Sequence, residues 1–436
     1  MFKKNILATV VLSQMLTAAA LPAMAQETDS IRTHVDIELS GYPDTKQLLI
    51  YEAYSDIRFG LIATHDVVNG KCSFDLSTDV PREMEIIFDN EFNNGSWKIK
   101  KFYAEGDTIR ASYYGNGERT DIISSSGTLQ TLNGIYKAHV NDAMGEVLQK
   151  YRSELEEMER SGEAVIEEVR PLYLQMKSAK GERRDSLLRL LQPINEKYKG
   201  DIYSQAYKMN IEKQSSLALR QDTIRWDYLV ESTPSLFGLM EIRGQLYRES
   251  PMQNVDEAME RLEHSFKAKY ADFASHPYFE ECKLMFATRK LRPGKKYDAD
   301  YKIHSVDGKE SYVSELTKGK PAIIDLWASW CGPCRRNSKA LIPVYEKYKP
   351  LGLAYVAVAR ESGNADAMLK AMEHDDYPWQ SYIDIDDADG IWAKNGCPNS
   401  GGRIFLIDAD GVIVHVDPTI DKIEEYLEKT FQNLPN

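Results

Sequence analysis

Apolar and polar residues alternate along the first part of the chain, between about residues 33 and 130. Successive side chains of a strand point to opposite faces of a sheet, so this period of two predicts strands with one buried face. The Asn69-Gly70 pair predicts a tight hairpin turn. Strands are predicted at 34–39, 48–51, 72–76, 85–88, 97–99 and 108–113. Short strands at regular spacing predict a small all-β domain, a sandwich or barrel, over residues 26–131.

The hydrophobic period becomes helical over residues 132–292. Apolar side chains follow i, i+3, i+4, i+7 spacing along 140–158, and Ser161-Gly162 predicts a break there. A second helix is expected over 165–180, with Pro171 as a kink or, as the alternative, at the start of a helix. Charged residues of both signs cover the outer faces. A solvated helical bundle explains this pattern, and a homodimer seam through the same region is the alternative.

Strand and helix patterns alternate in the last part of the chain, residues 297–436. The run 353–359 is almost continuously apolar, as in a sheet that is covered on both faces, and 322–326 is a second strand that is apolar apart from Asp325. Amphipathic helices are expected at 334–349, 365–374 and 420–431, and a hairpin joins 403–407 to 412–416. This order predicts an α/β domain.

The first 25 residues have the pattern of a signal peptide. Lys3 and Lys4 form a positive start, residues 6–21 are mostly apolar, and Ala23-Met24-Ala25 is an A-x-A cleavage site. We therefore expect cleavage after Ala25 and export to the periplasm. No later stretch approaches 18 apolar residues, so no membrane-spanning helix is expected.

Composition and charge narrow the possible partners. The chain is 42% hydrophobic and 28% charged, which is typical of a soluble globular protein. Its net charge of −13 disfavours nucleic acid and anionic membrane surfaces as partners. Of the five cysteines, Cys72 and Cys282 fall on predicted apolar faces, and Cys397 is expected to be a small apolar loop residue.

The remaining two cysteines belong to the pentapeptide Trp330-Cys331-Gly332-Pro333-Cys334. This motif follows an apolar strand and begins a predicted helix, so free backbone N–H groups and the helix dipole face the first sulfur. They favour the thiolate and make Cys331 the attacking sulfur, with Cys334 as the resolving one. Pro333 suits a first helical turn, and Gly332 leaves the sulfur accessible. A zinc site or a structural disulfide are alternatives, but the sequence has no second Cys pair or His pair at metal spacing.

Residues 320–335 resemble the active-site strand and helix of the thioredoxin superfamily, in particular its exported TlpA/ResA-like branch. The resemblance implies a thioredoxin-like fold for residues 297–436. The β region is similar to a domain of unknown function that often precedes TlpA-like modules. By position, the resemblance implies a buried proton acceptor at Asp325, an acidic residue of the site at Glu361, and a substrate-binding surface that includes Trp327 and Pro398.

The chain departs from the family pattern beside the dithiol. The family places a cis-proline just before the strand that reads Phe405-Leu406-Ile407-Asp408 here, but Gly401-Gly402-Arg403 precede this strand. Either Pro398 still packs beside Cys331 or Gly402 occupies the position. The kink proline of the family helix is replaced by Lys339, and Pro343 is a possible substitute.

These features predict a periplasmic thiol-disulfide oxidoreductase that reduces protein disulfides through Cys331 and Cys334. The Gly332-Pro333 dipeptide is that of thioredoxin, whose reduction potential is about −270 mV, whereas that of the oxidant DsbA is about −120 mV. Expected partners are protein disulfides and a membrane thiol electron donor; no cofactor beyond the redox disulfide and no metal are expected. A redox-sensing binding protein and a disulfide oxidase or isomerase are the alternatives. The helical region is expected to pack on the β domain and hold it at a fixed distance from the C-terminal domain.

Overall fold

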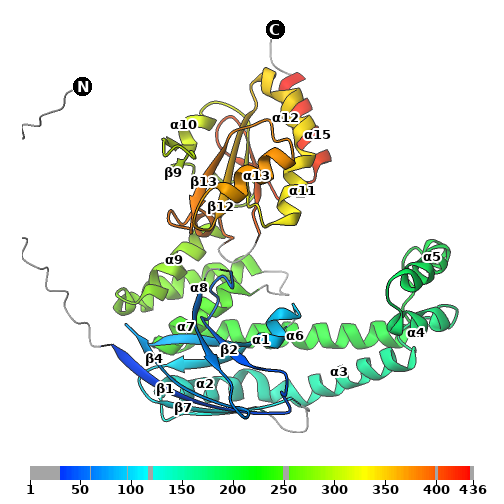
Figure 1. The fold of residues 1–436 in the computed structure, drawn as a ribbon, viewed down its shortest axis with the longest axis vertical. Coiled ribbons are helices and arrows are strands. Elements are labelled where there is room, and N and C mark those ends of the chain that lie inside the picture. Colours follow the sequence, from blue (N-terminus) through cyan, green and yellow to red (C-terminus); the bar gives the residue numbers. More distant parts are fainter. Residues whose placement is uncertain are drawn as a thin grey trace, which may run out of the picture.

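The computed structural model describes residues 30–58, 60–95, 97–115, 121–248, 255–397 and 401–432. Two small β-sheets, a long helical region and a larger mixed sheet follow one another along the chain (Figure 1). The predicted signal peptide, residues 1–25, lies outside the described residues. Within them, no helix is long and apolar enough to cross a membrane.

Two four-stranded sheets form the all-β domain, as the alternation predicts. The first sheet has the order β4 (Lys71–Thr78), β1 (Ile31–Ser40), β7 (Thr108–Tyr114) and β8 (Ile122–Ser124). The second has the order β3 (Leu61–Asp66), β2 (Gln47–Glu52), β5 (Arg82–Phe88) and β6 (Lys100–Ala104). Apolar residues of both sheets, among them Val35, Ile50 and Phe102, form one shared core.

Two details of the β domain differ from the prediction. Asn69 and Gly70 do form a turn with positive φ angles, but β3 and β4 on either side of it belong to different sheets. The predicted tight turn is present, because Val68 and Lys71 exchange both backbone hydrogen bonds across it. The two strands do not continue as a paired hairpin, however: β3 pairs with β2 and β4 with β1. Residues 97–99 are not a strand either, because the short helix α1 (Asp89–Asn93) intervenes and β6 begins at Lys100.

The helical region contains a long two-helix arm (Figure 1). Helices α3 (Ala143–Ser161) and α6 (Gln205–Glu231) run side by side, and α4 (Arg170–Ser178) and α5 (Glu182–Lys197) lie at the far end of the arm. Pro171 lies in the first turn of α4, where its missing N–H needs no partner, so it starts this helix and does not kink it. The other helices are α2 (Thr128–Lys137), a π-helical turn (Ala138–Asp142), α7 (Leu236–Tyr247), α8 (Val255–Lys269) and α9 (Pro277–Thr288).

Helix α7 is buried along almost its whole length and connects the helical region to the β domain. Its Phe237 packs against Tyr103 of β6, with ring centroids 6.2 Å apart. Tyr278 of α9 accepts a hydrogen bond from the Glu83 backbone N–H at 3.2 Å. The helical region therefore packs on the β domain through its core.

The C-terminal part is an α/β domain built on a seven-stranded sheet of order β10-β9-β13-β12-β11-β14-β15. Strand β11 (Ala322–Trp327), next to the central strand, pairs in parallel with β12 (Ala354–Glu361) and antiparallel with β14 (Ile404–Ile407). Apolar cores cover both faces of this sheet, which explains the continuous apolar runs. The other strands are β9 (Lys302–His304), β10 (Glu310–Tyr312), β13 (Ser381–Ile385) and β15 (Ile413–Val416). The helices are α10 (Val313–Thr317), α11 (Gly332–Ala340), α12 (Ile342–Tyr348), α13 (Asp366–His374), α14 (Ile391–Lys394) and α15 (Ile420–Gln432).

The helix predicted over 334–349 is in fact two helices, because the chain breaks at Leu341 between α11 and α12. Pro343 lies in the first turn of α12 and has no N–H to continue the α11 hydrogen-bond ladder. The break at Leu341 thus directly precedes the helical turn that contains Pro343, the possible substitute for the family's kink proline.

The β domain touches the C-terminal domain directly. Arg360 of β12 donates a hydrogen bond to Asp56, in the segment after β2, with 3.2 Å between Nη1 and Oδ2. The two domains are therefore in direct contact, and the fixed spacing expected from the helical region stays a prediction. The segment after β2 extends beyond its own sheet and reaches this contact.

Candidate active site

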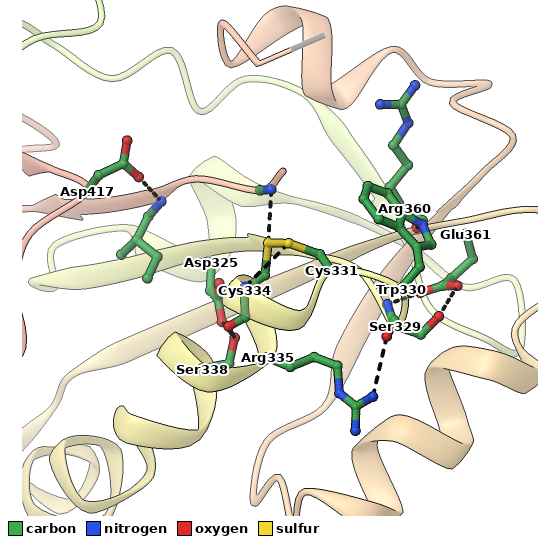
Figure 2. The surroundings of a disulfide bond; sticks show 12 residues. Asp325, Ser329, Trp330, Cys331, Cys334, Arg335, Ser338, Arg360, Glu361 and Asp417 are labelled. Atoms are coloured by element: carbon green, nitrogen blue, oxygen red, sulfur yellow. Dashed lines mark hydrogen bonds between the residues drawn. A yellow bond between two sulfur atoms is a disulfide. The ribbon is translucent and has the colours of Figure 1, made fainter. Parts of the chain in front are cut away.

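A disulfide between Cys331 and Cys334 lies where β11 leads into α11 (Figure 2). Cys331 is the N-cap residue of α11, and its Sγ accepts a hydrogen bond from the Cys334 backbone N–H at 3.3 Å. Pro333 lies in the first turn, where it needs no hydrogen-bond acceptor. The unpaired N–H groups of this helix start favour a thiolate on Cys331 once the disulfide is reduced.

Both cysteines are nearly buried in the oxidised protein. Cys331 is 6% exposed and Cys334 is 9% exposed. The two cysteines therefore differ little in exposure in this oxidised state. Gly401 contributes to the burial of Cys331, because its backbone lies so close that a Cβ on it would be only 3.1 Å from the Cys331 sulfur.

A glycine pair occupies the place where the family pattern has a proline. The Gly402 backbone N–H donates a hydrogen bond to Cys334 Sγ at 3.1 Å. A Cβ on Gly402 would lie 1.5 Å from the Leu326 carbonyl oxygen, so the backbone comes too close here for any side chain. The structure therefore has Gly402 beside the disulfide, whereas Pro398 lies outside the described residues.

Asp325 is buried on β11 beside α11 (Figure 2). Its Oδ2 accepts hydrogen bonds of 2.7 Å from the hydroxyls of Ser338 and Tyr355. The Ser338 hydroxyl also lies 3.1 Å from the Cys334 carbonyl oxygen, which brings Asp325 close to the second cysteine. Burial raises the pKa of Asp325 to about 6, and the two hydrogen bonds oppose this rise only in part. A carboxyl that titrates near 6 can accept a proton at neutral pH.

Glu361 holds the chain just before the dithiol. Its two carboxylate oxygens accept hydrogen bonds from the Ser329 backbone N–H and the Ser329 hydroxyl, both at 2.6 Å. Burial raises the pKa of Glu361, although both hydrogen bonds lower it. The contacts make Glu361 a residue that fixes the turn two positions before Cys331.

Trp327 does not reach the surface. It is fully buried, and its indole N–H donates to the Ser381 hydroxyl at 2.8 Å. The expectation that Trp327 contacts substrate is therefore wrong. Its place on β11 puts it in the core between the sheet and the helices.

Trp330 is partly exposed and is held from two sides. Its indole N–H donates to the Arg360 carbonyl oxygen at 3.2 Å (Figure 2). The guanidinium of Arg58 lies over the indole, 3.6 Å from the ring centroid. Sequence reasoning missed Arg58 and Asp56, because no local pattern connects residues of the β domain with a motif about 270 positions later.

Arg335 follows the dithiol, but its charge is already paired. Its Nε donates to Asp375 at 2.6 Å, and hydrogen bonding by Arg335 lowers the pKa of Asp375 to about 2. Its Nη1 also lies 3.4 Å from the Ser329 carbonyl oxygen. Arg335 therefore fixes the neighbourhood of the dithiol more than it adds uncompensated charge to it.

The three other cysteines are buried free thiols. Burial raises the pKa of all three, that of Cys397 to about 12. Cys397 packs in the core and lies 3.5 Å from the Trp392 carbonyl oxygen. Thiols of this kind are inert, because the reactive thiolate is hardly populated at neutral pH.

Comparison with known proteins gives matches in the C-terminal part. The Redoxin family matches residues 293–430. The thiol-disulfide oxidoreductase ResA of Bacillus anthracis is 27% identical over 146 residues, which cover 32% of this chain and 79% of that protein. The thiol:disulfide interchange protein DsbE of Pseudomonas fluorescens biotype C is 32% identical over 120 residues, covering 28% and 63%. The solved thioredoxin domain of a Bacteroides vulgatus thiol-disulfide oxidoreductase is 24% identical, with a TM-score of 0.29, over 32% of this chain and 99% of that one.

Proposed function

We propose that this chain, whose C-terminal part is a Redoxin domain with thioredoxin-like fold and homologues named ResA and DsbE, is an exported protein-disulfide reductase. The observation that carries the proposal is the Cys331–Cys334 disulfide at the start of α11, with backbone N–H groups directed at both sulfurs. The signal-peptide pattern of residues 1–25 supports export to the periplasm.

The reaction follows from the order of the two thiols. The Cys331 thiolate of the reduced protein attacks one sulfur of a partner disulfide, forms a mixed disulfide and releases the other partner sulfur as a thiolate, which takes up a proton. Cys334 then loses its proton, attacks the Cys331 sulfur and releases the second partner thiol. The partner disulfide gains two electrons, and the Cys331–Cys334 pair loses them. Asp325, close to Cys334, is the group we assign to accept the Cys334 proton.

Reduction is the direction that Gly332-Pro333 supports, since neither residue adds a side-chain donor that would stabilise the thiolate. The Gly402 backbone N–H has the opposite effect, because a hydrogen bond to Cys334 Sγ stabilises the thiolate and so favours the reduced form. We therefore expect a potential somewhat above that of thioredoxin, which is near about −270 mV. In an oxidising compartment such a reductase needs a membrane thiol donor to regenerate its dithiol.

The potential and the turnover of the full mature chain test this proposal. Equilibration with glutathione buffers should give a potential between about −270 and −200 mV, and a value above about −150 mV would instead indicate an oxidase or isomerase. With dithiothreitol as electron source, the protein should reduce insulin disulfides over many turnovers. Cys331→Ser should abolish this reaction.

A redox-sensing binding protein is the second candidate, because the β domain contacts the region of the dithiol through Asp56 and Arg58. A sensor would react once per molecule with the oxidised partner and then stop. Stoichiometric reaction without turnover in the insulin assay would favour this alternative.

A further inference from the structure

The segment after β2 carries two charged residues from the β domain to the edge of the dithiol site. Asp56 and Arg58 lie in this segment, and Trp330, which Arg58 covers, directly precedes Cys331. The Arg58 side chain remains 32% exposed. A protein that bonds to Cys331 must therefore approach a surface to which the β domain contributes.

Four residues close a ring of contacts around this point. Asp56 accepts hydrogen bonds from Arg58 Nε at 2.8 Å and from Arg360 Nη1 at 3.2 Å. The Arg360 carbonyl oxygen accepts the Trp330 indole N–H at 3.2 Å, and Arg58 stacks on the same indole. Asp56 thus holds both Arg58, which covers Trp330, and Arg360, whose backbone carbonyl accepts the indole N–H of Trp330.

The ring is part of the folded interior and is more than a surface contact. The side chains of Asp56 and Arg360 are only 5% and 3% exposed, and Arg360 also binds Asp387 at 3.1 Å. Buried charges persist only when they are paired, so each guanidinium and carboxylate here depends on the others. Burial would raise the pKa of Asp56, but hydrogen bonds from Arg58 and the charges of Arg58 and Arg360 hold it below its ordinary value.

We propose that Arg58 forms part of the surface that receives the protein substrate of the dithiol, and that Asp56 is the positioning residue that holds Arg58 over Trp330. The β domain then selects protein disulfides for a reaction that the C-terminal domain carries out. This inference rests on the proposed thiol-disulfide exchange, and it concerns which disulfides are accepted rather than whether exchange occurs. A small disulfide reaches Cys331 without contacting the surface that Arg58 and Trp330 form.

Two substrates of different size separate these roles in the full mature chain. For Arg58→Ala, we expect kcat/KM for insulin disulfides to fall about tenfold, mainly through a higher KM. The rate with the small disulfide 5,5′-dithiobis(2-nitrobenzoic acid) should stay within about twofold, and the glutathione redox potential should not change. Asp56→Asn should give the same pattern, and Arg58→Lys should recover part of the insulin activity, because an ammonium can also stack on an indole.

Arg32→Ala is the matched control, because this exposed arginine of the other sheet is likewise paired with an aspartate, Asp75. It should leave both rates unchanged. An Arg58→Ala variant that lost activity equally on both substrates, or on neither, would overturn the proposal. Since Asp56 is buried, thermal unfolding followed by circular dichroism accompanies each variant, and Arg58→Lys gives the result if Asp56→Asn does not fold. Wild-type protein without turnover on either substrate would instead contradict the proposed function.

Discussion

The raised pKa that suits Asp325 to accept a proton also means that its charged, buried form lowers the stability of the fold. Its pKa is about 6 in the folded protein, against about 3.9 in an unfolded chain. Between these values the folded state binds the proton and the unfolded state does not, so stability falls as pH rises through this window. The loss is complete about one pH unit above the folded-state pKa and amounts to about 3 kcal/mol.

Asp325→Asn should therefore make the oxidised protein more stable by up to about 3 kcal/mol at pH 8, with little change at pH 3.5, where Asp325 is already neutral in both states. Urea unfolding at the two pH values measures this difference. The same variant should slow insulin reduction on the order of 100-fold, because it has no group to accept the Cys334 proton. Equal stability changes at both pH values would contradict the raised pKa.

Cys397→Ser should leave insulin reduction within about twofold of the wild-type rate. The thiol is buried, and its pKa of about 12 keeps it protonated at neutral pH. A loss of tenfold or more, equal to about 1.4 kcal/mol of barrier, would mean that Cys397 takes part in exchange.

At the scale of residues, the sequence was informative where chemistry is encoded locally. Cys331 and Cys334 at a helix start follow from spacing, and the burial of Asp325 follows from the apolar run around it. Trp327 was misassigned because a motif does not say which of two neighbouring tryptophans points to the surface. Arg58 could not be predicted at all, since its partner depends on how two domains dock.

At the scale of elements, the start of β14 is fixed by close backbone contact. Gly402→Ala should destabilise the protein by about 3 kcal/mol, because its Cβ would overlap the Leu326 carbonyl and the chain must shift away from Cys334. Urea unfolding checks this value. Gly134→Ala in α2 is the control: nothing lies near its Cβ position, and alanine should stabilise that helix by about 0.5–1 kcal/mol. A Gly402→Ala variant as stable as the wild type would contradict the observed approach.

Hydrophobic periods predicted the central strands β11 and β12 well, since both are continuous apolar runs bounded by charged or turn residues. The turn at Asn69-Gly70 was also predicted, but the pairing of the strands on either side of it was not. Its residues specify the local bend, but the pairing of β3 and β4 is decided by contacts with β2 and β1 elsewhere in the chain. Turn chemistry is local, whereas sheet membership is not.

At the scale of the whole molecule, the boundary of the C-terminal domain can be tested by truncation. Backbone hydrogen bonds join Gly294 N–H to the Ile413 carbonyl and Ile413 N–H to the Lys295 carbonyl, both at 2.8 Å. A fragment of residues 293–436 keeps them, and one of 297–436 loses them. At about 1 kcal/mol per bond, the longer fragment should be more stable by about 2 kcal/mol in urea unfolding. Equal stabilities would show that residues 293–296 are not part of this domain.

The three-part division of the chain was predicted because the hydrophobic period itself changes from strand to helix and then to an alternation of both. How these parts dock was not predicted, because the contacts between them are made by single charged residues such as Asp56 and Arg360. These residues look like ordinary surface charges when only their neighbours in the chain are considered.

The distance between Asp56 and Arg360 along the chain, 304 residues, has a consequence for how the protein is made. Chains fold largely from the N-terminus as they are synthesised, so the β domain exists well before the strand that carries Arg360. Contacts of such long range also close late, because the entropy of a large loop opposes them. We therefore expect the dithiol site to form before Arg58 comes to lie over Trp330, so an oxidant that acts early meets this indole without its cover.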